Sequence, residues 1–202
     1  SKSFNNKCDK NVSEDQSLDK SIDHDIDINA LESVDDYTLI APADSYSEAL
    51  DVFNAMEIHG DPNENFEKGN QNYKLKEYES AIEFYTKTLK VNKEHFGATF
   101  NRGLCYFELQ KYEDAIIEYS KSLDICGEPE KSKVYFRRGT VYKFLGEHEK
   151  AIVDYTNAIN QNPNYYEAYE ERGFAFGILG NNSKAIDDFT KVINSEPSPS
   201  AF

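Results

Sequence analysis

The chain has 202 residues, a mean hydropathy of −0.73 and a formal net charge of −15. This acidity excludes an ordinary nucleic-acid-binding surface, because affinity for phosphates comes from clustered Lys and Arg and the sequence has no such cluster. It also argues against binding to anionic membrane surfaces, and no apolar run approaches the roughly 18–20 residues of a membrane-spanning helix. Residues 1–63 hold 15 acidic and four basic side chains, so most of the net charge lies near the N-terminus.

Residues 1–44 are rich in Asp, Ser, Asn and Lys, with scattered Ile and Leu. Such a composition buries too little apolar surface to offset the loss of chain entropy, so we expect this acidic leader to be mostly disordered. The chain starts at Ser1, lacks the apolar core of a secretory signal, and has three cysteines without metal-ligand spacing. These features predict reduced thiols and a cytoplasmic location; a nuclear location also fits. They leave open whether the chain is a piece of a longer protein.

Residues 45–60 differ from the leader. Ser45 and Glu48 have the spacing of a capping box, an apolar stripe follows, and Gly60 is a stop signal. We therefore predict a helix near 46–58, with Tyr46, Leu50 and Phe53 in its apolar stripe. Because repeat arrays need covered ends, we expect this helix to pack on the segment that follows as a cap.

The remainder of the chain repeats itself four times. Glycines recur at intervals of 34, 36 and 34 residues; twelve residues after each glycine comes an alanine followed by isoleucine, and four residues after that alanine comes an aromatic residue. The glycines are Gly69, Gly103, Gly139 and Gly173; the alanines are Ala81, Ala115, Ala151 and Ala185; the aromatic residues are Tyr85, Tyr119, Tyr155 and Phe189.

Apolar residues within each half of a repeat recur at intervals of three and four, the period of an amphipathic helix. Short polar stretches such as "LQKYED" separate the two halves. Each repeat is therefore predicted to be an antiparallel helix pair, and stacked pairs bury a shared core. We expect an all-α solenoid over residues 62–197, with pairs at 62–92, 96–126, 132–162 and 166–195, and a tail at 198–202. The two extra residues of the third interval fit in the loop "CGEPEKSK".

Each repeated glycine lies inside the first predicted helix of its pair, where it costs up to about 1 kcal/mol relative to alanine. A cost that recurs indicates a use that recurs. Without a side chain there, the facing helix can approach closely, and we expect the small alanine twelve residues on to receive it.

The period, the Gly–Ala–aromatic columns, and Pro163 and Pro197 after the last two pairs resemble the tetratricopeptide repeat family. The family's early Trp is absent; Tyr135 and Tyr169 take its place in two repeats. The resemblance implies a right-handed superhelix whose concave groove is lined by the first helix of each pair and binds peptide segments or helices of partner proteins. It places the groove around the glycines, at Phe66, Glu67, Asn70, Tyr73 and Lys74; Phe100, Asn101, Leu104 and Phe107; Lys133, Phe136, Arg137, Thr140 and Lys143; Glu170, Glu171 and Phe174.

Some members of the family are co-chaperones that hold the acidic C-terminal tail of heat-shock chaperones in a two-carboxylate clamp of Lys and Asn, then Asn, then Lys and Arg. The matching positions here are Phe66, Asn70, Asn101, Lys133 and Arg137, of which four agree. Arg can fork a carboxylate, Lys adds a point charge, and Asn amides donate hydrogen bonds without charge. Phe66 removes one of the three cations. We therefore favour a groove for another peptide segment and keep the chaperone tail as the alternative.

A basic residue directly precedes each glycine: Lys68, Arg102, Arg138 and Arg172. These residues could form a basic ladder. We expect instead that each lies on the seam between repeats, with its aliphatic stem packed and its charged head in water.

The sequence shows no nucleophile–base pair, no phosphate-binding loop and no Cys/His metal set. We expect no enzyme activity within these residues, no cofactor, and another protein as the partner. Two further interpretations stay open: the repeats as the interaction arm of a longer enzyme, or a self-associating scaffold that docks through the apolar side of the last helix.

Overall fold

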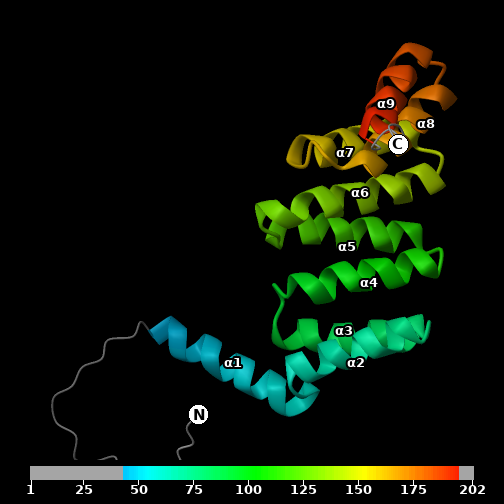
Figure 1. Cartoon of the computed structure of the whole chain (residues 1–202). Coiled ribbons are helices and arrows are strands. Elements are labelled where there is room, and N and C mark those ends of the chain that lie inside the picture. The colour runs from blue at the N-terminus through cyan, green and yellow to red at the C-terminus, as the bar shows by residue number, and fades with distance from the viewer. Residues whose placement is uncertain (1–42, 196–202) are drawn as a thin grey trace, which may run out of the picture. The chain divides into compact units, whose positions relative to one another are not determined.

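The computed structural model describes residues 43–195, with side chains for residues 47–195. The tail and almost all of the acidic leader lie outside them, as does the side chain of Ser45. The described residues form nine helices and no strand, which confirms the predicted all-α solenoid (Figure 1). Helix α1 (Ala43–His59) comes first. The four pairs are α2 (Pro62–Lys74) with α3 (Tyr78–Val91), α4 (Phe96–Glu108) with α5 (Tyr112–Ile125), α6 (Glu128–Phe144) with α7 (His148–Gln161), and α8 (Tyr166–Ile178) with α9 (Asn182–Ser195).

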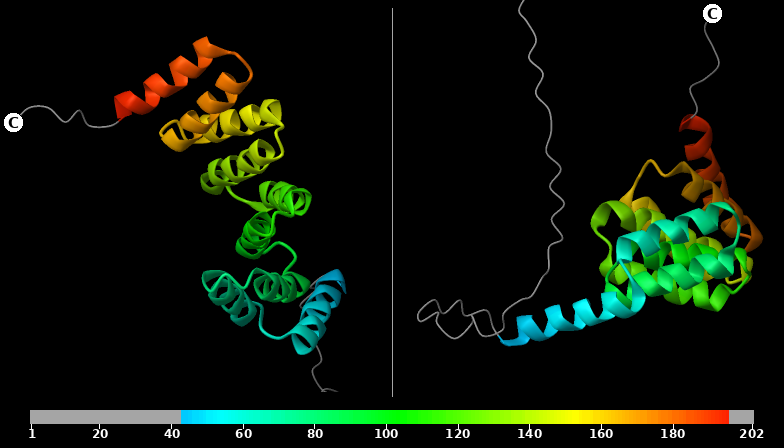
Figure 2. Two further views of the ribbon diagram at one scale, coloured as in Figure 1. Left: turned by 90° about the vertical axis from the view of Figure 1, so that its right-hand side faces the viewer. Right: turned by 90° about the horizontal axis from the view of Figure 1, so that it is seen from below.

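The helix pairs stack in chain order (Figures 1 and 2). The second helix of each of the first three pairs packs on the first helix of the next: α3 on α4, α5 on α6, and α7 on α8. The core therefore runs through the stack as a series of clusters, each of which joins neighbouring pairs.

Helix α6 begins at Glu128, four residues before the expected start of the third pair. The stretch "CGEPEKSK" was predicted to be a loop that absorbs the two extra residues of this interval, and that prediction is wrong. Pro129 lies in the first turn of α6, where a missing backbone N–H costs nothing. The extra residues therefore lengthen a helix.

The repeated glycines are where the two helices of a pair meet, but the partner differs from the expected one. A Cβ atom on Gly139 would lie 2.9 Å from Cε1 of Tyr155, and one on Gly103 would lie 2.9 Å from Cε1 of Tyr119. The first and last pairs repeat this contact, with Tyr85 and Phe189. The glycine thus receives the aromatic ring of the second helix and not the alanine, which is buried one turn earlier.

A phenylalanine three residues before the glycine packs on the same ring in the first three pairs. The ring centroids are 5.9 Å apart for Phe66 and Tyr85, 5.6 Å for Phe100 and Tyr119, and 5.7 Å for Phe136 and Tyr155. Aromatic pairs at such distances add about 0.5–1.5 kcal/mol beyond their buried area. Each of these pairs is therefore built on a Phe–Gly–Tyr unit.

Helix α1 contains the helix predicted near 46–58, and it contacts α3. It therefore packs on the first repeat as expected, but its apolar stripe is left largely exposed: Leu50 and Phe53 are each 59% exposed, and Ile58 is 75% exposed. The half-buried residues on the described part of the helix are Ala55 and His59. The small Ala55 gives α1 little apolar area with which to seat itself on α3.

The glycine contact predicts opposite outcomes for the same substitution at two helical sites. Gly139→Ala should lower the free energy of unfolding by about 1–3 kcal/mol, because the new methyl group overpacks against Tyr155. Gly177→Ala in α8 should raise it by up to about 1 kcal/mol, because that site is open and alanine is the better helix former. Urea denaturation measures both changes. Equal effects at the two sites would contradict the account of the glycine column.

Candidate functional site

The first helices of successive pairs are tied to one another by the predicted groove residues. The Nδ2 of Asn101 on α4 donates to the Oδ1 of Asn70 on α2 (2.9 Å), and Tyr85 donates its hydroxyl to the same oxygen (3.0 Å). Further along the stack, the Nζ of Lys143 on α6 donates to both carboxylate oxygens of Glu171 on α8, at 2.9 and 2.7 Å. The predicted groove face of the first helices is therefore tied from α2 to α4 and from α6 to α8.

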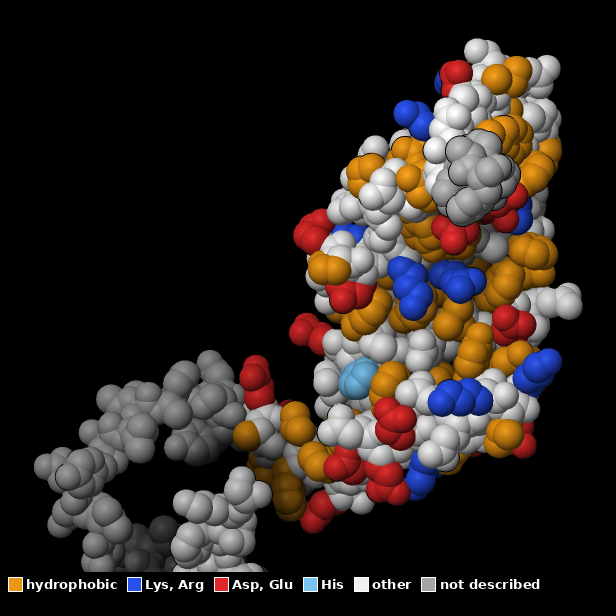
Figure 3. Space-filling view, in the orientation of Figure 1, with side chains coloured by type: hydrophobic (Ala, Val, Ile, Leu, Met, Phe, Trp, Pro, Cys, Tyr) orange, Lys and Arg blue, Asp and Glu red, His pale blue; other side chains and the backbone are white. Residues whose placement is uncertain are grey.

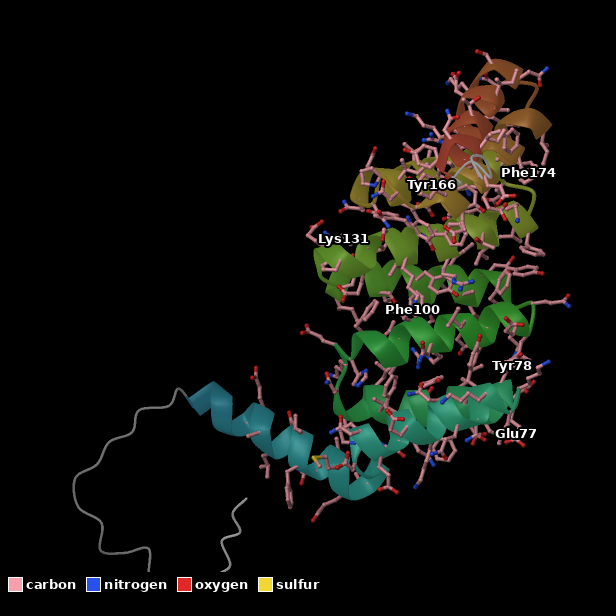
Figure 4. All side chains as sticks on the ribbon, in the orientation of Figure 1. Glu77, Tyr78, Phe100, Lys131, Tyr166 and Phe174 are labelled. Carbon is pink, nitrogen blue, oxygen red and sulfur yellow. The ribbon has the colours of Figure 1, made fainter. Side chains whose placement is uncertain are left out.

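Lys133 and Arg137 lie one turn apart on α6, and both are exposed. Within residues 47–195 neither forms an ion pair of 4.0 Å or less. The Nζ of Lys133 lies 5.1 Å from the centroid of the Phe100 ring on α4. Figure 3 shows Lys and Arg side chains gathered near the middle of this face, amid hydrophobic and uncharged atoms, and Figure 4 labels Phe100 close by.

The positive charge of Arg137 acts on tyrosines of three different helix pairs. Burial raises the pKa of Tyr73, Tyr119 and Tyr165, and the charge of Arg137 opposes that rise for each of them.

The other predicted groove residues divide into packing residues and surface residues. Phe100 is only 3% exposed, so it belongs to the core and not to the surface of the groove. Phe66 is half-buried between Tyr85 and the ring of His95, whose centroid lies 4.6 Å from its own. Tyr73 packs on Tyr78, with ring centroids 5.6 Å apart. Lys74 is exposed in the last turn of α2.

The three arginines that precede the glycines lie on the seam between pairs, as expected, but their heads are not in water. Arg138 on α6 donates through Nε and Nη2 to both carboxylate oxygens of Asp154 on α7, each at 2.8 Å. Its Nη1 donates to the hydroxyl of Ser120 on α5, in the preceding pair. Arg172 makes the same contacts with Asp188 and Thr156, and Arg102 makes similar ones with Glu118 and Thr86.

The acids Glu118, Asp154 and Asp188 were missed by sequence reasoning, although a signal was present. Each stands three residues after the repeated alanine, and a Ser or Thr follows two residues later, in "AIIEYS", "AIVDYT" and "AIDDFT". The first repeat reads "AIEFYT", with Phe84 in the place of the acid, and its Lys68 pairs instead with Glu64 on its own helix. Three of the four repeats therefore share an Arg–acid–hydroxyl latch.

Other kinds of site find little support in the described part of the chain. Within it, no group of three His, Cys, Asp or Glu side chains could hold a metal ion. None of its helices is long and apolar enough to cross a membrane. Burial raises the pKa of the Cys105 thiol to about 12, so this cysteine is a core residue and a poor nucleophile near neutral pH.

Arg137 and Arg138 are adjacent in the sequence, but we expect their replacement by alanine to have very different effects on stability. Arg138→Ala leaves the carboxylate of Asp154 buried without its partner, so we expect it to lower the free energy of unfolding by about 3 kcal/mol or more. Arg137→Ala removes an exposed side chain without an ion pair, and should change that free energy by less than about 0.5 kcal/mol. Urea denaturation of both variants checks the assignment; a comparable loss in both would refute the division between latch and surface.

Comparisons with known proteins agree with this architecture. The family model for the tetratricopeptide repeat matches residues 132–165, and the model for subunit 3 of the anaphase-promoting complex, or cyclosome, matches residues 43–122. A search of curated proteins finds no match.

Solved structures of similar fold include a crystal structure of MamA, at 22% sequence identity and a TM-score of 0.66, over 72% of this chain and 84% of that one. MamA from Desulfovibrio magneticus matches at 19% identity and a TM-score of 0.63, over 79% and 99%. The first tetratricopeptide repeat domain of Spaghetti (RPAP3), bound to the HSP90 peptide SRMEEVD, matches at 28% identity and a TM-score of 0.55, over 59% and 93%. Residues 132–165 therefore match the model of the tetratricopeptide repeat, and the described helix pairs share the fold of these solved structures.

Proposed function

We propose that the chain is an adaptor that binds an acidic peptide segment of a partner protein across the face of its first helices, and that Arg137 and Lys133 hold a carboxylate of that peptide. A tetratricopeptide repeat array is a protein-interaction module, so the partner's chemistry must be inferred from side chains that packing does not use. The observation that carries the proposal is the contrast between the latched arginines and Arg137, which forms no ion pair within residues 47–195.

The surroundings of these two cations suit a carboxylate. A guanidinium can donate two parallel hydrogen bonds to one carboxylate, and the ammonium of Lys133 stands one turn away on the same helix. The ring of Phe100, a core residue, lies beneath Lys133. Apolar packing under this cation lowers the local dielectric constant, which strengthens its interaction with a bound carboxylate.

A narrower version of the proposal is a co-chaperone that binds the acidic tail of a heat-shock chaperone. The Spaghetti domain, 28% identical to this chain, is bound to such a peptide. Asn70, Asn101, Lys133 and Arg137 occupy four of the five clamp positions. Phe66 argues against this version, because it fills the fifth position with a ring that packs on Tyr85.

Binding of the fluorescein-labelled peptide SRMEEVD, measured by anisotropy, tests the proposal. Replacing Arg137 with Ala should weaken binding at least about tenfold, because truncation of one partner of a charge-assisted pair typically costs 2–5 kcal/mol. Lys87→Ala on α3 removes the same charge from an exposed site on a second helix and serves as the matched control. It should change the affinity by less than about twofold.

Binding should also weaken as salt is raised, because salt screens exposed charges. Failure of the wild-type chain to bind the peptide at low salt would overturn the proposed acidic ligand. Equal losses from Arg137→Ala and Lys87→Ala would show only a general effect of net charge, and would contradict the assigned site.

A second candidate function is self-association through α9. Ile186 and Ile193 on this helix are 64% and 71% exposed, whereas α3, α5 and α7 each pack on the first helix of the next pair. Ile193→Glu should then convert a dimer into a monomer in light scattering. A wild-type mass that is monomeric at all concentrations would remove this candidate.

A further inference from the structure

We propose that the groove has a place for one carboxylate only, at Arg137 and Lys133, and that it takes this carboxylate from an acidic side chain inside the peptide. Binding should then not require a free C-terminus. This inference rests on the proposed function and adds to it the class of peptide. It follows from the charges of the residues on the neighbouring first helices, which are α4 and α2 on one side of the two cations and α8 on the other.

Toward α4, the repeat equivalents of the two cations are uncharged. Lys133 stands six residues before its glycine, and the same position on α4 is Gly97; Arg137 stands two residues before it, and the same position is Asn101. A Cβ on Gly97 would lie 2.8 Å from Cζ of Phe66, so the ring of Phe66 fills the space in which a longer side chain would begin.

His95 does not replace the missing cation. Its Nδ1 accepts a hydrogen bond from the backbone N–H of Ala98 (3.0 Å), so this ring nitrogen is used to cap the N-terminus of α4.

The side-chain amides of Asn70 and Asn101 are hydrogen-bonded to each other. The Oδ1 of Asn70 accepts from both Asn101 and the hydroxyl of Tyr85, so the two amides hold α2 against α4. Neutral amides can meet the backbone of an extended peptide, but they do not supply the charge that a second carboxylate would need when it leaves water.

The remaining groove cation on α2, Lys74, stands five residues after its glycine, and the same position on α4 is Glu108. Glu108 acts on Tyr73, the neighbour of Lys74, and raises the pKa of that tyrosine in addition to the rise from burial. A positive residue on α2 and a negative residue on α4 therefore occupy equivalent repeat positions at this end of the groove, which weakens its attraction for a second anion.

On α8, the residues at the same two repeat positions are acidic instead of basic. The equivalents of Lys133 and Arg137 on this helix are Glu167 and Glu171. Glu171 is matched by Lys143, whereas Glu167 is exposed and makes no ion pair within the described residues. A second acidic residue of the ligand that reached α8 would meet a like charge, which disfavours a run of carboxylates along the groove.

Three labelled peptides test the inference: SRMEEVD with a free C-terminus, the same peptide with a C-terminal amide, and the amide with both glutamates replaced by glutamine and the aspartate by asparagine. The full chain should bind the first two with affinities within about twofold, because the added terminal carboxylate meets no cation. The third should bind at least about tenfold more weakly than the second, since it lacks the internal carboxylates that Arg137 would hold. In Arg137→Ala the difference between the second and third peptides should disappear.

A tenfold loss on C-terminal amidation, without a further loss when the acidic side chains are replaced, would overturn the inference while leaving an acidic-peptide groove in place. So would a dependence on the acidic side chains that persists in Arg137→Ala. If the chain binds none of the three peptides, the proposed function itself fails. The three results differ, so the two proposals can be rejected separately.

Discussion

The tightest packing contact in this structure joins a glycine in the first helix of each pair to an aromatic ring in the second helix. At Gly139 and at its counterparts in the other pairs, the ring occupies the space that a Cβ would need. Any side chain there would push the two helices apart. Glycine therefore stands at this position in all four pairs, although it destabilises a helix relative to alanine. A phenylalanine one turn before the glycine packs on the same ring in three pairs. This packing fixes the spacing of each pair, and with it the direction in which the first helices present their outer face.

The seam between pairs is fixed by a different interaction, the Arg–acid–hydroxyl latch. Arg138 reaches forward to α7 in its own pair and back to α5 in the preceding one, so a single side chain holds three helices in register. The junction of α2 with α4 differs, because the first repeat lacks the acid. There Asn70 and Asn101 bridge the helices, and Phe66 fills the gap above Gly97. Phe66, which stands where the clamp would have its first lysine, thus has a packing role at that junction.

These two interactions explain how two adjacent arginines come to serve different purposes. Arg138 points into the seam and is satisfied by a buried carboxylate, whereas Arg137, one residue earlier, is exposed and forms no ion pair within the described residues. Under the proposed function, an exposed basic side chain that packing does not use marks the place where a ligand's charge would be met. Net composition hides this, because the chain as a whole is strongly acidic.

Periodicity was enough to predict the fold, since the glycine, alanine and aromatic columns mark every helix pair. It could not tell which residue of the facing helix would meet the glycine, because alanine and the ring lie one turn apart on the same side. The helical start at Glu128 was missed because Gly127 and Pro129 read as a loop, although proline is tolerated in a first turn. The exposure of α1 depends on packing partners rather than on its own amphipathic pattern. For the site, spacing brought Arg137 and Lys133 to one face, but the burial of Phe100 and the pairing of the other arginines required the structure.

The central claim is that the ring and the missing Cβ compete for one space, and a double-mutant cycle at Gly139 and Tyr155 tests it most directly. Urea unfolding would give the cost of Gly139→Ala in the wild type and in a Tyr155→Leu background, where the shorter side chain leaves room for the methyl group. The account predicts a coupling free energy of at least about 1 kcal/mol, with the alanine less harmful beside leucine. Additive effects, within about 0.5 kcal/mol, would contradict it.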